Sequence, residues 1–231
     1  MIINAQNICK SFSNKTENAN AKNVNEVLKG VSIEIEKGKI TTIMGASGAG
    51  KSTLLYILGT LETPDSGSIT LNVNAKNYDY SNLSEKELSF IRNRHIGFIF
   101  QFHHLLPEFS VLENIMMPGL IFGDSTKSIE AKALELMQKV GIEKIRNQKP
   151  AEISGGEQQR AAIARALINS PDIIFADEPT GNLDSTNANV VVELIKEINH
   201  LMEISFVIAT HSNEIAIQSD KIIKMQDGKI I

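Results

Sequence analysis

Several features are absent or scarce in this sequence, and each absence removes a class of protein. Cys9 is the only cysteine among 231 residues, which excludes an internal disulfide and a cysteine-rich zinc site. Because no apolar run reaches about 18 residues, we expect no membrane-spanning helix. The net charge of -4 gives no basic footprint for nucleic acid. The N-terminus lacks a basic segment followed by an apolar stretch and a cleavage site, so we expect a cytoplasmic chain that is not exported.

The composition that remains is that of an ordinary globular protein. Hydrophobic residues make up 42% of the chain and charged residues 22%, which excludes a disordered or fibrous protein. A chain of this length buries roughly 70 to 75% of its unfolded surface, so it can hold a core without disulfides or metals. We therefore expect one domain, with room for a subdomain.

Short apolar segments alternate with amphipathic stretches, which is typical of an α/β fold. We expect strands at residues 2–8, 27–35, 39–44, 96–100, 172–176, 205–209 and 221–225. The segments at 172–176 and 205–209 are apolar almost without interruption, which favours a parallel sheet covered on both faces. Residues 13–25 contain five asparagines, so we expect a polar, mobile loop or hairpin tip there.

Serine followed three residues later by glutamate is the pattern of a capping box, and it predicts three helix starts. The boxes lie at residues 84–87, 110–113 and 154–157. Another amphipathic helix is expected from Ser128 to Val140, with Gly141 ending it. Because helix signals dominate from about 101 to 165, this block is predicted to be a helical subdomain. It would be inserted into a sheet core formed by about 1–100 and 166–231.

The sharpest motif is a glycine-rich loop that fits G-x-x-x-x-G-K-[ST], with a predicted strand before it and an apolar helix after it. Glycines let backbone N–H groups turn toward phosphate oxygens, Lys51 reaches the β and γ phosphates, and the Ser52 hydroxyl can ligate magnesium. The alternative is a glycine-rich turn before a helix. The predicted nucleotide-binding residues are Gly45, Ala46, Ser47, Gly48, Ala49, Gly50, Lys51, Ser52 and Thr53.

Two acidic residues, Asp177 and Glu178, follow the predicted strand at 172–176, at the edge where open α/β sheets bind ligands. Successive residues diverge in direction. Asp177 can therefore hold magnesium, directly or through water, while Glu178 faces the attacking water as general base. On its own, the pair would be interpreted as solvated acids before a Pro-Thr-Gly turn.

The predicted helix that follows Ser154 begins with two glycines, which is unusual for a start that needs only a cap. Ser154 and Glu157 can form the capping box, but Gly155 and Gly156 add backbone freedom that folding must remove. Glycines make sense there if a phosphate approaches this end of the helix. The segment, which continues to Gln158, can thus be a simple cap or a phosphate contact.

Together the motifs resemble the nucleotide-binding domains of ABC transporters, whose signature segment runs Leu-Ser-Gly-Gly-Gln. The resemblance covers nearly the whole chain, and the motifs occur in the family's order. It implies a P-loop NTPase fold with a mostly parallel sheet core, an N-terminal antiparallel β portion and an inserted helical subdomain. It also implies ATP, Mg2+ and ATP hydrolysis coupled to transport. The matching positions are the glycine loop, Gln101, residues 154–157, Asp177, Glu178, residues 183–184 and His211.

The resemblance also implies a site shared by two copies that pair head to tail. Residues 154–158 of one copy would contact the nucleotide held by the glycine loop of the other, and Asp184 would line the seam. Gln101 would contact magnesium and the attacking water and report the nucleotide state to a membrane partner. His211 would contact the γ phosphate, its alternative being a satisfied histidine at a strand end. Phe12 would stack on adenine, its alternative being a core residue.

The chain departs from the family pattern at three places. Ile153 stands in place of the signature leucine, and Phe12 stands where tyrosine is more frequent, which keeps the stacking face and loses a hydroxyl. The asparagine-rich segment follows Phe12 directly. These departures make the adenine end the least well defined part of the predicted site.

Residues 96–118 and 179–184 resemble more narrowly the LolD-type ATPases of lipoprotein-releasing complexes. These belong to a larger group with MacB-type exporters and FtsE-type division ATPases. The resemblance implies a peripheral subunit at the cytoplasmic face of the bacterial inner membrane, working with separate transmembrane permease subunits. An FtsE-like regulator of cell-wall hydrolases and a MacB-like exporter ATPase remain as alternatives. A nucleic-acid-associated ABC ATPase would bring a long coiled coil, zinc-binding cysteines, tandem domains or a basic face, none of which occurs in the sequence.

Two adjacent histidines, His103 and His104, lie in the first of these segments. Adjacent histidines rarely chelate one ion together, and no cysteine lies near them, which disfavours a metal site. In the family this stretch lies by the groove that receives a cytoplasmic segment of the membrane subunit. Partner contact is therefore the better hypothesis.

Overall fold

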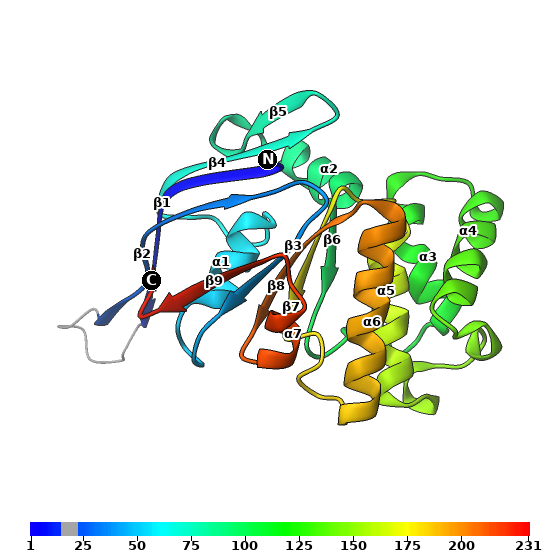
Figure 1. The fold of residues 1–231 in the computed structure, drawn as a ribbon. Helices are drawn as coiled ribbons and strands as arrows, with labels where there is room; N and C mark the ends of the chain where they lie inside the picture. Colours follow the sequence, from blue (N-terminus) through cyan, green and yellow to red (C-terminus); the bar gives the residue numbers. More distant parts are fainter. Residues whose placement is uncertain (15–22) are drawn as a thin grey trace.

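The computed structural model describes residues 1–14 and 23–231, and its strands form two sheets (Figure 1). The smaller sheet is antiparallel and has the strand order β2-β1-β4-β5. Its strands are β1 (Ile3–Asn14), β2 (Asn23–Ile35), β4 (Ser66–Val73) and β5 (Lys76–Asp79). This sheet is the N-terminal antiparallel portion that was predicted.

The larger sheet carries the parallel core, in the order β10-β9-β3-β8-β7-β6. All pairs from β9 to β6 are parallel, and only the β10 pairing is antiparallel. Its strands are β3 (Ile40–Met44), β6 (Ile96–Ile99), β7 (Ile173–Asp177), β8 (Ser205–Thr210), β9 (Lys221–Gln226) and β10 (Lys229–Ile230). Every residue of β7 and β8 is buried, as their continuous apolar runs predicted, because helices cover both faces.

Helix α1 (Lys51–Leu58) lies between the two sheets (Figure 1). It shares one apolar cluster with both of them, to which β1 contributes Ile3, α1 contributes Leu55 and β7 contributes Phe175. The start of α1 is therefore fixed from two sides.

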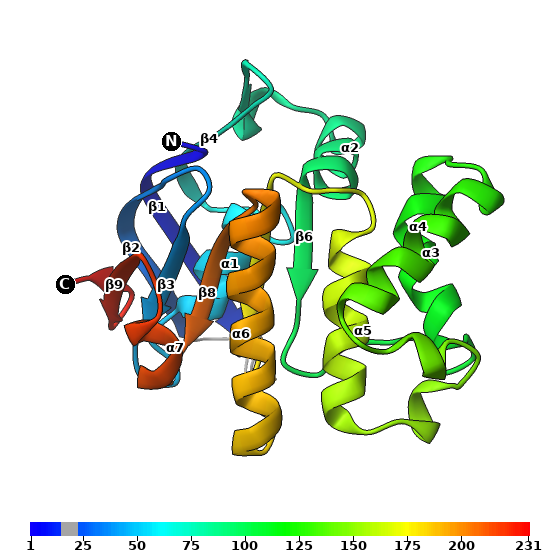
Figure 2. The same ribbon diagram turned by 45° about the vertical axis from the view of Figure 1, so that its right-hand side comes forward.

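The opposite face of the parallel sheet is covered by helices that form the second apolar cluster (Figure 2). These helices are α3 (Val111–Phe122), α4 (Thr126–Lys139), α5 (Gly155–Leu167) and α6 (Ser185–Met202). The remaining helical segments are α2 (Glu85–His95), α7 (Asn213–Ile217) and three short 3-10 turns, Tyr80–Asn82, Glu143–Ile145 and Pro150–Glu152. Within residues 1–14 and 23–231, none of the helices combines the length and the apolar character that a membrane span requires.

The three predicted capping boxes are present, at the starts of α2, α3 and α5, each with both of its hydrogen bonds. The predicted start of α4 at Ser128 is wrong. Ser125 is the N-cap and accepts a hydrogen bond from the Ser128 N–H, so the helix begins at Thr126. Both serines are good N-cap residues, so the sequence did not distinguish them. In the structure, the Ser125 hydroxyl caps the helix, and Ser128 lies in its first turn.

The predicted polar loop at 13–25 is also wrong at both ends. Ser13 pairs with Val24 and Asn14 with Asn23, because the antiparallel ladder of β1 and β2 continues through these polar residues. The mobility expected for the rest of this segment concerns residues 15–22, which lie outside the described residues. Strands β4 and β5 were not predicted, although Ile69, Leu71 and Val73 alternate along β4 as buried residues do in a half-buried strand.

Candidate active site

The carboxyl ends of β3, β6, β7 and β8 meet at one edge of the parallel sheet and form the floor of a cavity of about 740 Å³. Ligands bind at this edge in open α/β sheets. The glycine loop contributes most of the lining, through residues 46–48 and 50–53, and β2 adds Asn25 and Val27. The strand ends contribute Gln101, Asp177, Glu178 and His211. The structure thus gathers residues far apart in the sequence.

The glycines of the loop are required by its backbone and its neighbours. A Cβ at Gly45 would lie 2.2 Å from the Met225 carbonyl oxygen of β9, which is too close for any other residue. Gly48 and Gly50 have φ values of 80° and 97°, in the region that favours glycine. In addition, the Gly228 N–H donates to the Ala49 carbonyl at 3.2 Å. The turn between β9 and β10 therefore braces the loop from behind.

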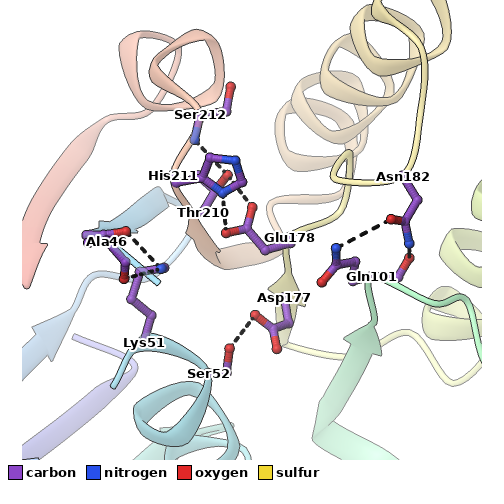
Figure 3. A network of polar contacts seen from close by, with 11 residues as sticks. Ala46, Lys51, Ser52, Gln101, Asp177, Glu178, Asn182, Thr210, His211 and Ser212 are labelled. Atoms are coloured by element: carbon purple, nitrogen blue, oxygen red, sulfur yellow. Dashed lines mark hydrogen bonds and ion pairs between the residues drawn. The ribbon is translucent and has the colours of Figure 1, made fainter. Parts of the chain in front are cut away.

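Lys51 is the first residue of α1, and its side chain folds back over the loop (Figure 3). Its Nζ donates to the carbonyl oxygens of Gly45 at 2.8 Å and Ala46 at 3.1 Å. An ammonium group has three donors, so a third N–H is left for a phosphate oxygen. No side chain caps α1, whose N-cap is Gly50, so its first backbone N–H groups also face the cavity without a side-chain acceptor.

Asp177, the last residue of β7, accepts hydrogen bonds from two side chains of α1. The Ser52 hydroxyl donates to Oδ1 at 2.8 Å, and the Tyr56 hydroxyl donates to Oδ2 at 2.7 Å. Burial, together with the hydrogen bond to Asp177, raises the pKa of Tyr56, so its hydroxyl keeps its proton at neutral pH. A hydroxyl and a carboxylate at this distance are the hard oxygen ligands that magnesium prefers.

Glu178 is held by β8, next to Asp177. Its backbone N–H donates to the Ala209 carbonyl at 2.8 Å, and its φ of 45° is strained for a residue with a side chain. Its Oε2 accepts a hydrogen bond from the Thr210 hydroxyl at 2.9 Å, and its Oε1 lies 2.8 Å from Nδ1 of His211 (Figure 3). The carboxylate is therefore aimed into the cavity beside His211, whose side chain is exposed.

Gln101 lies just after β6 on the other side of Asp177 and is held by Asn182. Asn182 Nδ2 donates to the Gln101 carbonyl at 3.0 Å, and Gln101 Nε2 lies 3.5 Å from Asn182 Oδ1. A Cβ at Gly181 would lie 3.0 Å from Gln101 Nε2, so glycine leaves room for the amide. The loop that follows β7 thus supports both Glu178 and Gln101.

The other predicted site residues do not line this cavity. The described residues that line it do not include Phe12, Asp184 or residues 154–158. Phe12 is 42% exposed on β1, paired with the cavity residue Asn25, and Lys10 Nζ lies 5.2 Å from its ring centroid. Asp184 caps α6 by accepting from the Asn187 N–H at 2.9 Å, and this contact lowers the pKa of Asp184.

Residues 154–158 form the N-cap and first turn of α5, where Ser154 and Gly155 are exposed and Gly156 is buried. A Cβ at Gly156 would lie 2.4 Å from Asn187 Oδ1, so a larger residue would displace the Asn187 side chain where α5 packs against α6. A Cβ at Gly155 would meet only Leu183, at 3.9 Å. Gln158 Nε2 donates to the carbonyls of Pro150 and Ile153 and supports the turn before the helix. Internal packing therefore explains Gly156 but leaves Gly155 free for another role.

His103 and His104 form a strained turn beside a second cavity of about 400 Å³. Their φ values are 37° and 47°, and Arg165 of α5 donates to both of their carbonyl oxygens at 2.6 Å. Burial lowers the pKa of His103. Phe98, Phe100 and His104 line this cavity together with residues of α2, α3 and α5. The histidines thus stand at a groove between the sheet and the helices.

Three residues of the active-site network were missed by sequence reasoning, namely Tyr56, Thr210 and Asn182. Tyr56 lies four residues after Ser52, a spacing that puts both on one face of a helix, so this position could have been identified. Thr210 and Asn182 act through contacts across the chain that local spacing does not indicate.

Comparison with known proteins gives consistent results. A family model described as ABC transporter matches residues 28–181. The "Lipoprotein-releasing system ATP-binding protein LolD" of Bacteroides fragilis is 46% identical over 230 residues, with 100% of both chains covered. The protein of the same name from Aquifex aeolicus is 48% identical over 206 residues, which cover 89% of this chain and 90% of that one.

Solved structures agree in fold. The dimeric bacterial ABC transporter cassette MJ0796 is 37% identical and has a TM-score of 0.87, with 99% of this chain and 96% of that chain covered. A post-hydrolysis state of the same cassette, dimeric and bound to ADP and Pi, is 36% identical and has a TM-score of 0.86 over the same shares of the two chains.

Proposed function

Because the chain belongs to the ABC transporter family, we propose that it is the ATP-hydrolysing subunit of a complex that releases lipoproteins from a membrane. The substrate class is supported by relatives named for lipoprotein release that match the chain over its full length. The single observation that carries the ATPase chemistry is the cavity edge, where Lys51, the Ser52–Asp177 pair and Glu178 converge.

Magnesium fits the residues at this edge. The Ser52 hydroxyl and the Asp177 carboxylate, 2.8 Å apart, would hold the ion, and Gln101 would reach it from the end of β6. When bound, it would neutralise charge on the β and γ phosphates. Lys51 and the open N-terminus of α1 bind the same phosphates from the other side.

Glu178 is the proposed general base. Its carboxylate is held by Thr210 and His211, so it can orient a water and take its proton while His211 contacts the γ phosphate. We expect Glu178→Gln to bind ATP with little change but to hydrolyse it about 100-fold or more slowly. Equilibrium binding of fluorescent ATP and single-turnover hydrolysis test this, and near-normal hydrolysis would remove Glu178 as the base.

The site is proposed to be completed by a second copy. Ser154 and Gly155 are exposed at the start of α5 and do not line the cavity, and a Cβ at Gly155 would meet only Leu183, at 3.9 Å. In a head-to-tail dimer residues 154–158 would contact the nucleotide of the partner, and Asp184 at the start of α6 would line the seam. Phe12, exposed on β1 beside the cavity, would stack on the adenine ring.

The membrane subunits are proposed to contact the second cavity. Its apolar wall, formed by Phe98 and Phe100, lies next to Gln101, so contact there is well placed to sense the nucleotide state. Residues 101–165 would act as a helical subdomain within the single ABC domain. The chain would thus be peripheral at the cytoplasmic face of the inner membrane, held there by permease subunits.

Copurification with the membrane subunits, followed by an ATP-dependent lipoprotein release assay, tests the proposal. We expect release from membranes that depends on ATP and is lost in Glu178→Gln. If ATP turnover activated a cell-wall hydrolase and released no lipoprotein, the transport function would be refuted and the regulatory alternative supported.

A further inference from the structure

We infer that Tyr56 is a positioning residue that fixes the carboxylate of Asp177 for magnesium. The inference rests on the proposed nucleotide function and adds a residue to it. Tyr56 would not contact the ion itself, because its hydroxyl donates to the carboxylate oxygen that Ser52 leaves free.

Both oxygens of the Asp177 carboxylate are held by hydrogen bonds from α1. Ser52 donates to Oδ1 at 2.8 Å and Tyr56 to Oδ2 at 2.7 Å, both from consecutive turns of α1. Asp177 is 7% exposed, so water has little access to replace either donor. Two donors on one rigid helix hold both oxygens and prevent the carboxylate from rotating about its own bond.

The ring of Tyr56 is itself held in place. It contacts the ring of Phe100, with centroids 6.3 Å apart and planes tilted by 58°. Phe100 in turn stacks on Phe98 at 5.6 Å and lies edge-on to His104 at 5.1 Å. The hydroxyl therefore points at Asp177 from a packed aromatic row, as a preorganised support should.

Loss of the hydroxyl would leave Oδ2 of a buried carboxylate without this donor, and the carboxylate could turn away from Ser52. Hydrogen-bond partners of metal ligands affect metal affinity by about 10- to 100-fold. We expect Tyr56→Phe to reduce the gain in ADP affinity that Mg2+ gives by about 10-fold. Affinity for ADP without metal should stay unchanged, because Lys51 and the glycine loop are intact.

The experiment measures ADP binding to the full chain, once with Mg2+ and once with EDTA, so that no turnover is involved. Tyr80→Phe is the matched control. Tyr80 is also half-buried, and its hydroxyl also donates to α1, at the Leu58 carbonyl 3.1 Å away, but it does not touch Asp177. Both variants thus lose one tyrosine hydroxyl bound to the same helix.

A loss of the magnesium gain in Tyr56→Phe alone supports the inference. It is overturned if Tyr56→Phe keeps the wild-type gain, or if both variants lose it equally, since that would be a general effect on α1. A wild-type chain that binds ADP equally with and without Mg2+ would overturn the proposed magnesium site and the inference with it, whereas a wild-type chain that binds no ADP under either condition would overturn the proposed nucleotide site. These outcomes separate failure of the inference from failure of the function.

Discussion

Helix α1 begins after a glycine-rich loop, and helix α5 begins with two glycines. The backbone N–H groups at these two N-termini are satisfied in different ways. Helix α1 follows Gly50 and has no side-chain cap, so its first N–H groups depend on a ligand or water. Helix α5 follows Ser154, whose capping box is closed by Glu157 at 2.8 Å from the Ser154 N–H. The first start has no side-chain cap, whereas the second is capped by side chains of its own chain.

The uncapped start of α1 is suited to binding a ligand, whereas the capped start of α5 is satisfied by folding alone. Around α1, the glycines serve the loop conformation, and the open helix end is available to phosphate in the same copy. At α5, the box uses the N–H groups of Ser154 and Glu157, which leaves those of Gly155 and Gly156 outside it. A helix end that is already capped and exposed is suited to meet a nucleotide carried by another molecule.

The largest expected effect separates the two helix starts by function. Ser154→Arg should slow hydrolysis by about 100-fold, because it obstructs a contact that is made only when two copies close on the nucleotide. ADP binding by dilute protein should not change. Lys51→Ala is the matched variant at α1 and should lose ADP binding itself. If Ser154→Arg hydrolysed normally as a monomer, the shared site would be refuted.

A smaller effect separates the two glycines of α5. Gly156→Ala should lower the free energy of unfolding by about 1 to 3 kcal/mol, because its Cβ would overlap Asn187. Gly155→Ala should be neutral or slightly stabilising, since alanine favours helix and the space is open. Urea unfolding without nucleotide measures both.

Asn187→Ala provides the internal control for this pair. Combined with Gly156→Ala, it removes the obstacle, so the double variant should lose less stability than the two single changes added together. Additive losses would show that the contact between Gly156 and Asn187 does not limit the packing of α5 on α6.

The smallest expected effect is the loss of stability when the N-cap serine of α5 is removed. Ser154→Ala should cost about 1 kcal/mol, and Ser110→Ala at α3, which has the same box, should cost a similar amount. Hydrogen bonds from Ser154 lower the pKa of Glu157 in the folded protein. The ionised carboxylate therefore contributes fully to the free energy of unfolding above its unfolded pKa of about 4.3, and this contribution is lost as the pH falls through its folded pKa.

The difference between wild type and Ser154→Ala should therefore be largest near neutral pH and shrink as the pH is lowered toward about 3. Unfolding curves at several pH values measure it. A difference that stays constant over this range would contradict a role for ionised Glu157 in the box.

Much of the fold could be predicted because patterns within single segments indicate strands and helix starts. The continuous apolar runs of β7 and β8 indicated buried parallel strands, and the capping boxes indicated helix starts. Strand β4 was missed because its first residues, Ser66 and Gly67, are typical of a turn. The ends of β1 and β2 were missed because pairing in the ladder, which no local pattern reports, carries polar residues into the sheet.

In the site, the residues of the phosphate motif were predictable because their chemistry requires fixed spacing. Those supplied by distant parts of the chain were not, since Tyr56 matters only through Asp177 of β7 and Thr210 only through Glu178. At the start of α5, the sequence left a cap and a phosphate contact open as explanations. The structure adds a packing constraint that the sequence did not indicate, since a Cβ at Gly156 would meet Asn187 of α6.

The brace behind the phosphate loop has a consequence for how the protein acquires its activity. The loop at Gly45–Thr53 is synthesised early, but Met225 and Gly228, which press against it, come far later in the chain. Contacts of such long separation form late, because a large loop must close before they stabilise anything. A growing chain on the ribosome thus contains the phosphate motif before it contains the residues that brace it, and we expect nucleotide binding only after the β9–β10 turn has docked on the loop.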